Sequence, residues 1–193
     1  MRRVLITEKI HPDAEALLRQ HFKVVQGSGT EHVAEELQGC EGILVRSAHV
    51  TAEDMEKNPQ LKVIAKHGMG LDAIDMKAAA ERQIAVVNAP YSNLNAVAEH
   101  IVMLLLALSK RVVRMDKLTR QGQFTQRNTY KTRELKGATL GIIGMGKISK
   151  LVVKKLAGFE MNVISSDPFV AQENVGDLSV RMTSAEEVYQ TSD

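Results

Sequence analysis

TLGIIGMGKIS, residues 139–149, is the stretch that says most about this protein. The apolar run from Thr139 to Ile143 predicts a buried strand, and the Gly-x-Gly that follows it predicts a tight turn. After the turn, apolar residues recur at helical spacing, at Ile148, Leu151, Val152 and Leu156. Gly158 is predicted to end this helix, and Met161 to Ser165 is predicted to form a second strand. The segment is therefore expected to be a βαβ unit.

Each marked position of this unit has a physical role in binding a dinucleotide. Gly144 permits the sharp turn out of the strand, and Gly146 has no Cβ, so a diphosphate can approach the backbone there. The amides of Lys147 and Ile148, at the positive end of the helix, are expected to bind that anion. Asp167 lies 21 residues beyond Gly146 and is expected to accept hydrogen bonds from the adenine ribose. Its charge repels a 2′-phosphate, so the sequence favours NAD over NADP.

Two features qualify this interpretation. The third position of the motif, normally Gly or Ala, holds Ser149, whose hydroxyl is able to bond back to the preceding turn of the helix. A chance glycine turn in an ordinary α/β unit remains the alternative to a nucleotide site. A second Gly-x-Gly, Gly68-Met69-Gly70, has no acidic residue at the ribose spacing, so it is not expected to bind the dinucleotide. Its amides suit a small carboxylate instead.

The first ninety residues alternate short β-branched runs with helical patterns, which predicts a parallel sheet covered on both faces. The predicted strands are residues 3–7, 22–25, 42–46, 61–66 and 84–87. The predicted helices are residues 13–20, 31–37, 52–57 and 72–82. Ligands of such sheets bind beyond the carboxyl ends of the strands.

The segment Asn88 to Asn93 is rich in turn-forming residues and predicts a crossing into a second domain. One long helix is predicted from about Leu94 to Arg120, because this stretch has no Gly or Pro. Residues 121–137 are polar and are predicted to form a loop with one helical turn. Between Lys110 and Lys136 there are nine basic and two acidic residues. This local net charge of +7 predicts a solvated face or a subunit contact, with an anionic partner as the alternative.

Composition narrows the functional class. Of 193 residues, 44% are hydrophobic and 25% charged, which is typical of a globular domain. The net charge of +2 favours neither nucleic acid nor a membrane as partner, and no apolar run approaches the roughly 20 residues of a bilayer span. The N-terminus does not resemble a signal peptide, so a cytoplasmic location is expected. Cys40 is the only cysteine, and we expect no metal site.

Four motifs in order resemble the D-isomer-specific 2-hydroxyacid dehydrogenases, and the resemblance covers nearly the whole chain. They are residues 61–75 with Gly68-Met69-Gly70-Leu71-Asp72, Val87-Asn88-Ala89-Pro90, Ala96-Val97-Ala98-Glu99-His100, and Leu135-Lys136-Gly137 leading to Gly144-Met145-Gly146. The resemblance implies an α/β protein with two domains. Residues 1–92 would form a flavodoxin-like, parallel-sheet substrate domain, and residues 93–193 the first part of an incomplete Rossmann NAD-binding domain.

The resemblance also implies a substrate site. The amides of Met69 and Gly70 would hold the carboxylate of a small 2-hydroxy or 2-keto acid. Arg46 and Ser47 fall where members acting on 3-phosphoglycerate, in serine biosynthesis, contact the distal phosphate; the alternative is that Arg46 is a solvated strand end. The helix and basic loop from Leu94 to Lys136 resemble the family's dimerisation region, which implies a homodimer.

The family's catalytic Arg, Glu and His all lie downstream of the ribose-binding Asp. After Asp167 the chain has one Arg and three Glu but no His, so no catalytic residue is assigned. Glu99 and His100 are adjacent on a predicted helix and point about 100° apart, so they do not form a pair. We expect a fragment of a dehydrogenase, or a shortened gene product, that is inactive alone. The alternative is a module that binds NAD or a partner without catalysis.

Overall fold

The structure is a computed structural model that describes residues 1–29 and 33–193. The chain divides into two compact units, Met1–Ser92 (unit 1) and Asn93–Asp193 (unit 2). Among the helices in the described ranges, none has both the length and the apolar character that crossing a bilayer requires.

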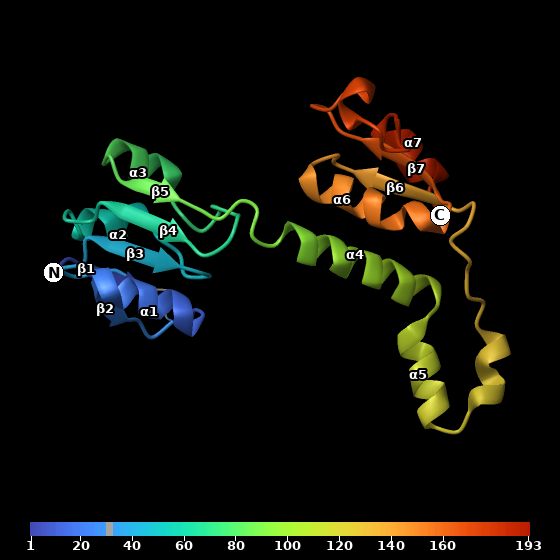
Figure 1. The fold of residues 1–193 in the computed structure, drawn as a ribbon, viewed down its shortest axis with the longest axis horizontal. Helices are drawn as coiled ribbons and strands as arrows, with labels where there is room; N and C mark the ends of the chain where they lie inside the picture. Colours follow the sequence, from blue (N-terminus) through green and yellow to red (C-terminus); the bar gives the residue numbers. More distant parts are fainter. Residues whose placement is uncertain (30–32) are drawn as a thin grey trace. The chain divides into compact units, whose positions relative to one another are not determined.

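Unit 1 is built on one parallel sheet of five strands in the order β2-β1-β3-β4-β5. This is the flavodoxin-like order, and it confirms the predicted α/β class with a parallel sheet. The strands are β1 (Arg3–Ile6), β2 (Lys23–Gln26), β3 (Gly42–Val45), β4 (Val63–Lys66) and β5 (Ala85–Val87). The helices are α1 (Pro12–His21), α2 (Ala52–Lys57) and α3 (Met76–Glu81), and the first part of Figure 1, from blue to green, traces them.

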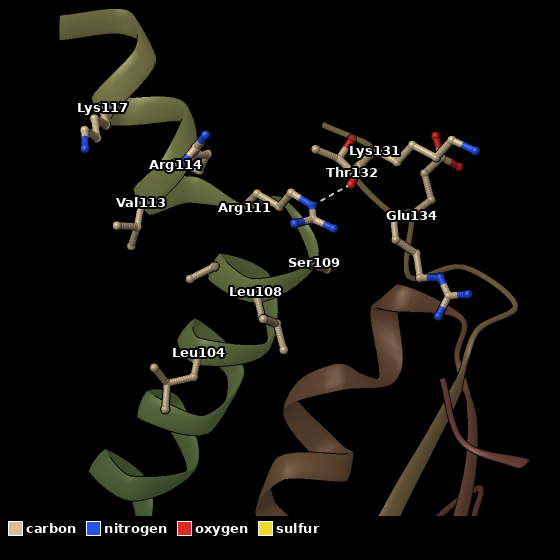
Figure 2. Close-up of a pocket in the computed structure, with 12 residues that line it drawn as sticks. Leu104, Leu108, Ser109, Arg111, Val113, Arg114, Lys117, Lys131, Thr132 and Glu134 are labelled. Atoms are coloured by element: carbon tan, nitrogen blue, oxygen red, sulfur yellow. Dashed lines mark hydrogen bonds between the residues drawn. The ribbon is translucent and has the colours of Figure 1, made fainter. Parts of the chain in front are cut away.

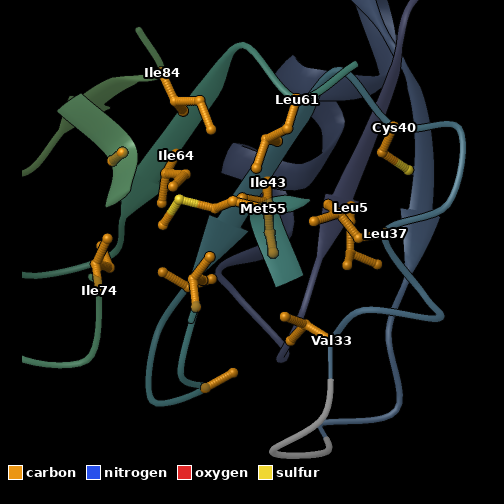
Figure 3. Packing of buried hydrophobic residues seen from close by; sticks show 14 of the residues in the cluster. Leu5, Val33, Leu37, Cys40, Ile43, Met55, Leu61, Ile64, Ile74 and Ile84 are labelled. Carbon is orange, nitrogen blue, oxygen red and sulfur yellow. The ribbon is translucent and has the colours of Figure 1, made fainter. Parts of the chain in front are cut away.

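The core of unit 1 lies on one face of this sheet (Figure 3). Leu5, Ile43 and Ile64, from three neighbouring strands, are almost fully buried there and pack with Met55 of α2. Because side chains alternate along a strand, the residues next to these three in each strand point to the opposite face of the sheet, where α1 lies. This packing fixes the register of the sheet and brings the carboxyl ends of its strands to one edge.

One predicted helix of unit 1, residues 31–37, is wrong where the structure describes it. Glu31 and His32 lie outside the described residues, and residues 34–39 form turns. The Leu37 amide donates to the Val33 carbonyl at 2.9 Å, as in one turn of an α-helix. Gly39 then adopts a left-handed φ of 70°, and Val33 and Leu37 are buried in the core. The two apolar side chains are thus buried by one turn, without a full helix.

Unit 2 contains a parallel sheet of three strands in the order β6-β7-β8. The strands are β6 (Thr139–Ile143), β7 (Asn162–Ser166) and β8 (Arg181–Met182). The helical segments are α4 (Leu94–Ser109), α5 (Val112–Arg120), η1 (Phe124–Thr129), α6 (Lys147–Leu156), η2 (Ala157–Phe159), η3 (Gln172–Val175) and α7 (Ala185–Thr191). This order corresponds to the first three strands of a Rossmann sheet.

The predicted single helix from Leu94 to Arg120 is wrong, because it is broken between α4 and α5. Arg111 has a left-handed φ of 52°, although it is not a glycine. The segment that returns toward α4 explains the break: the Arg133 amide donates to the Ser109 carbonyl at 2.9 Å, and Arg111 Nε donates to the Lys131 carbonyl at 2.7 Å. These contacts satisfy the end of α4, so the backbone turns there.

The end of α6 also differs from its prediction. Gly158 lies inside the short helix η2, and Glu160, with a φ of 53°, makes the left-handed turn instead. The Gly137 amide donates to the Glu160 carbonyl at 2.9 Å, and Lys136 pairs with the Glu160 carboxylate at 2.7 Å. These tertiary contacts stabilise Glu160 in the left-handed conformation, which at the end of a helix is usually adopted by a glycine.

Candidate functional site

The glycine turn of unit 2 lies at the carboxyl edge of its sheet. Gly144 has a φ of 90°, a left-handed conformation that a side chain rarely adopts. Its amide donates to the Ser166 carbonyl at 2.8 Å, which ties the turn to the end of β7. The motif therefore forms the sharp strand-to-helix turn that its sequence predicts.

Gly146 leaves the start of α6 open. It is the N-cap residue of α6, and no side chain in the described part of the chain caps this helix. A Cβ built at Gly146 would meet no atom within 4 Å, although its φ of −79° suits any residue. By contrast, α2, α3 and α7 begin with side-chain caps from Thr51, Asp75 and Ser184. The α6 end, where Lys147 and Ile148 lie, is thus accessible to a ligand.

Ser149 supports the turn in a way the sequence predicted only in part. Its hydroxyl donates to the Gly144 carbonyl at 2.6 Å, so it bonds to the glycine turn itself rather than within the helix. Ser149 therefore holds the loop closed at the position where the common motif has Gly or Ala.

Asp167 follows β7 and lies against the same turn. Its Oδ2 accepts from the Met145 amide at 2.7 Å, and its Oδ1 accepts from the Phe169 amide at 2.8 Å. The amides of Phe169 and Met145 hold the pKa of the Asp167 carboxyl below its usual value. A carboxylate oxygen has lone pairs for more than one hydrogen bond. Both oxygens of Asp167 can therefore also accept hydrogen bonds from ribose hydroxyls. The open turn and this carboxylate fit the diphosphate and ribose of a dinucleotide.

At the carboxyl edge of the unit 1 sheet, Arg46 and Ser47 follow β3 and are exposed. Their amides are already occupied, because Glu8 Oε2 accepts from the Arg46 amide at 3.0 Å and Oε1 from the Ser47 amide at 2.6 Å. Oε1 also accepts from the Ala48 amide at 3.1 Å. Burial raises the pKa of Glu8, but the Thr7 hydroxyl and these amides outweigh it and lower the pKa. The Arg46 guanidinium has no ionic partner among the described residues.

Met69 and Gly70 lie in the loop after β4, at the same edge, and both are exposed. Gly68 turns the chain with a φ of 138°, and Asn88 Nδ2 donates to the Met69 carbonyl at 2.7 Å. Asp72 lies beside the loop, since a Cβ on Gly70 would come within 2.9 Å of its carboxylate. Within the described ranges, the Met69 and Gly70 amides make no hydrogen bond, so they are available to a ligand.

Within unit 1 the structure thus brings the Arg46–Ser47 loop and the Met69–Gly70 loop to one edge. Sequence reasoning missed two residues that hold the first of these loops: Glu8, and Lys66, whose ammonium group donates to the Arg46 carbonyl. A signal was present: Glu8 follows β1 and Lys66 ends β4, the two strands beside β3. In a parallel sheet, residues at the carboxyl ends of neighbouring strands lie close together.

Unit 2 also carries a groove of about 1140 Å³ between α4, α5 and the returning residues 131–134 (Figure 2). Its apolar wall includes Leu104, Leu108 and Val113, of which Leu108 is 79% and Val113 82% exposed. Arg114 and Lys117 of α5 line the groove beside them. An apolar surface of this kind, flanked by basic residues, is typical of a protein contact.

A family model, described as the D-isomer specific 2-hydroxyacid dehydrogenase catalytic domain, matches residues 4–190. The D-3-phosphoglycerate dehydrogenase of Archaeoglobus fulgidus is 34% identical over 195 residues, covering 99% of this chain and 37% of the relative. That of Methanocaldococcus jannaschii is 36% identical over 185 residues, covering 94% of this chain and 35% of the relative. The chain thus spans about a third of the length of these relatives.

Two solved dehydrogenase structures are also similar to this chain. The D-lactate dehydrogenase from Aquifex aeolicus, complexed with NAD and lactic acid, superposes with a TM-score of 0.88 at 29% identity, covering 98% of this chain and 58% of that one. The NAD-dependent formate dehydrogenase from Staphylococcus aureus, in complex with NAD, gives 0.85 at 27% identity, covering 100% and 63%. The chain therefore belongs to the D-isomer specific 2-hydroxyacid dehydrogenase family.

Proposed function

We propose that this chain is part of an NAD-dependent oxidoreductase of small 2-hydroxy acids. The observation that carries the proposal is the turn at Gly144 and Gly146, which leaves an uncapped helix start beside the Asp167 carboxylate. The diphosphate of NAD would lie on the amides of Lys147 and Ile148, and Asp167 would bind the adenine ribose. When bound, NAD supplies the acceptor for the hydride of the substrate.

Unit 1 is proposed as the substrate domain. The amides of Met69 and Gly70, which make no hydrogen bond to any described residue, suit the substrate carboxylate. The exposed guanidinium of Arg46 and the hydroxyl of Ser47 suit a second anionic group on the substrate. We therefore propose 3-phosphoglycerate, in serine biosynthesis, as the substrate of the whole enzyme. The relatives named D-3-phosphoglycerate dehydrogenase support this choice.

For residues 1–193 alone we propose binding without turnover. Hydride transfer requires an acid or base for the hydroxyl proton and a clamp for the carboxylate. Within the described ranges, no histidine follows Asp167, and the one arginine there, Arg181, is paired with Glu187 at 2.7 Å. The alternative function is a module that binds NAD or a partner and never supports catalysis. It predicts the same behaviour for this chain but no activity in any longer form.

Titration calorimetry with NAD tests the nucleotide site. Gly146→Val should leave the fold intact, because the added Cβ meets no atom within 4 Å, but should obstruct the diphosphate. Loss of two charge-assisted hydrogen bonds predicts an affinity about 100-fold lower. Gly158→Val is the matched control, because its added Cβ also meets nothing within 4 Å. Equal affinities in the wild type and Gly146→Val would refute the site.

A longer form that includes a downstream segment should reduce NAD in the presence of 3-phosphoglycerate, which the absorbance of NADH reports. Activity on other 2-hydroxy acids but not on 3-phosphoglycerate would keep the class of reaction and reject the substrate. No turnover with any 2-hydroxy acid would favour the non-catalytic alternative.

A homodimer is proposed through the region from Leu94 to Lys136. The exposed apolar side chains of Leu108 and Val113 support it, since they are the kind that a subunit contact buries. Sedimentation should give the mass of a dimer, and Leu108→Asp should shift it toward the monomer, because a charge would then be desolvated in the interface. A wild-type monomer would exclude this surface as a dimer contact.

A further inference from the structure

We propose that Glu8 is a positioning residue for substrate binding: its carboxylate fills the three amides of the Arg46–Ala48 loop and so aims the Arg46 guanidinium and the Ser47 hydroxyl at the ligand. This inference rests on the proposed function, because it concerns the residues assigned to the second anionic group of the substrate. It adds a residue from another strand to that site.

The contacts of Glu8 bridge two neighbouring strands. Glu8 follows β1, and its two oxygens accept three hydrogen bonds from consecutive amides after β3, at 2.6 to 3.1 Å. The Thr7 hydroxyl donates to the same carboxylate. Successive amides that point at one anion form a binding concavity, and here an internal side chain occupies it. The loop is therefore held by a charge that the protein itself supplies.

The Arg46 peptide is fixed from both sides. Its amide donates to Glu8, and its carbonyl accepts from the Lys66 ammonium group at the end of β4. The Arg46 side chain extends from this fixed peptide and has no ionic partner among the described residues. A guanidinium on a fixed backbone loses less freedom on binding an anion than one on a mobile loop.

Filling the amides also determines how an anion approaches. With Glu8 in place, a phosphate group cannot use the backbone of residues 46–48 and must bind the side chains of Arg46 and Ser47. Like charges repel, so the Glu8 carboxylate also opposes an anion that comes too close. If Glu8 is a positioning residue, the gain from holding Arg46 and Ser47 in place must outweigh this repulsion of the anion. Removing Glu8 shows which of the two effects is larger.

The test uses the whole 193-residue chain with Glu8→Ala, Glu8→Gln and the control Glu15→Ala. Glu15 is a helix residue of α1 whose carboxylate, among the described residues, hydrogen-bonds to Arg19 alone. Amide hydrogen exchange is followed by NMR at residues 46–48 and, as internal references, at Ile43 and Ile64. Binding of 3-phosphoglycerate is followed by calorimetry, alongside D-lactate, which has the carboxylate and hydroxyl but no phosphate.

For Glu8→Ala, we expect exchange at residues 46–48 to accelerate about tenfold or more while the references stay unchanged. Affinity for 3-phosphoglycerate should fall about tenfold, and affinity for D-lactate should not change. Added acetate should restore slow exchange and phosphoester affinity, because it provides a free carboxylate for the vacated amides. Glu8→Gln keeps one acceptor oxygen and should give intermediate values, which carry the test if Glu8→Ala does not fold.

Unchanged exchange at residues 46–48 in both Glu8 variants would overturn the proposal. So would tighter binding of 3-phosphoglycerate by Glu8→Ala, because repulsion would then be the main effect of the charge. If the wild type binds no 3-phosphoglycerate, the substrate proposed above is wrong. In that case the exchange and acetate results still decide whether Glu8 holds the loop.

Discussion

The two units bury their apolar residues differently. In unit 1, one cluster of fifteen buried residues covers a face of a five-stranded sheet. In unit 2, a three-stranded sheet carries two smaller clusters, of four and three buried residues, while α4 and α5 leave Leu108 and Val113 largely exposed. Single substitutions should therefore cost much more stability in the core of unit 1 than on the helices of unit 2.

The largest expected effect comes from a pair of truncations. Ile64→Ala, at a fully buried residue of β4, should lower the free energy of unfolding by about 2–5 kcal/mol. Leu108→Ala, measured at a protein concentration at which the chain is monomeric, should change it by no more than about 0.5 kcal/mol, because that side chain is 79% exposed in the single chain. Urea unfolding of both variants measures the difference. Equal costs would show that Leu108 is buried within the monomer and would contradict the comparison.

A smaller effect is expected where α7 covers the sheet of unit 2. A Cβ at Gly141 of β6 would overlap the Ser192 hydroxyl and come within 2.7 Å of Val188 Cγ1. Gly141→Ala should therefore destabilise unit 2 by about 1–3 kcal/mol through overpacking. Hydrogen exchange of β7 amides should accelerate, while that of β4 amides should not. Gly158→Ala is the control, and acceleration in both variants would indicate a general effect of replacing glycine in this unit.

Elements with strong local signals were predictable from the sequence. The five strands of unit 1 lie within two residues of their predicted bounds, because β-branched runs end at polar residues there, and α2 matches the predicted 52–57. The turn after β6 was predictable as well, since a left-handed φ at residue 144 requires glycine. Local patterns determine these features, so one sequence suffices to find them.

Features set by distant contacts were not predictable. The break at Arg111 depends on hydrogen bonds from the segment at Lys131 and Arg133, which nothing near residue 111 announces. The loop at Arg46 depends on Glu8, 38 residues earlier in the chain. The sequence indicated candidate ligand-binding residues, but the residues that hold the Arg46 loop in place come from other strands.

Substitution of Asp167 tests the unit 2 site with a smaller effect. Asp167→Asn removes the charged acceptor and should weaken NAD binding about tenfold. It should also narrow the preference for NAD over NADP, because the repulsion of a 2′-phosphate is lost. Since the pKa of Asp167 lies below its usual value, this carboxylate should stay charged from pH 7 to pH 5. Calorimetry with both dinucleotides at the two pH values measures these effects, and a steep loss of wild-type affinity at pH 5 would contradict them.

The smallest effect concerns the acid dependence of unit 1. The folded-state pKa of Glu8 is lowered, so its charged hydrogen bonds add stability above the unfolded-state pKa of about 4.3. That contribution is lost as pH falls through the lower folded-state value. The stability difference between the wild type and Glu8→Gln should thus be full at pH 7 and shrink below pH 4, as urea midpoints would show. Asp167 of unit 2 also accepts hydrogen bonds from backbone amides, so Asp167→Asn serves as a control. This substitution should not change how the exchange of β4 amides responds to acid. A difference for Glu8→Gln that persists unchanged to pH 2 would mean that packing of the side chain, and not its charge, holds the loop.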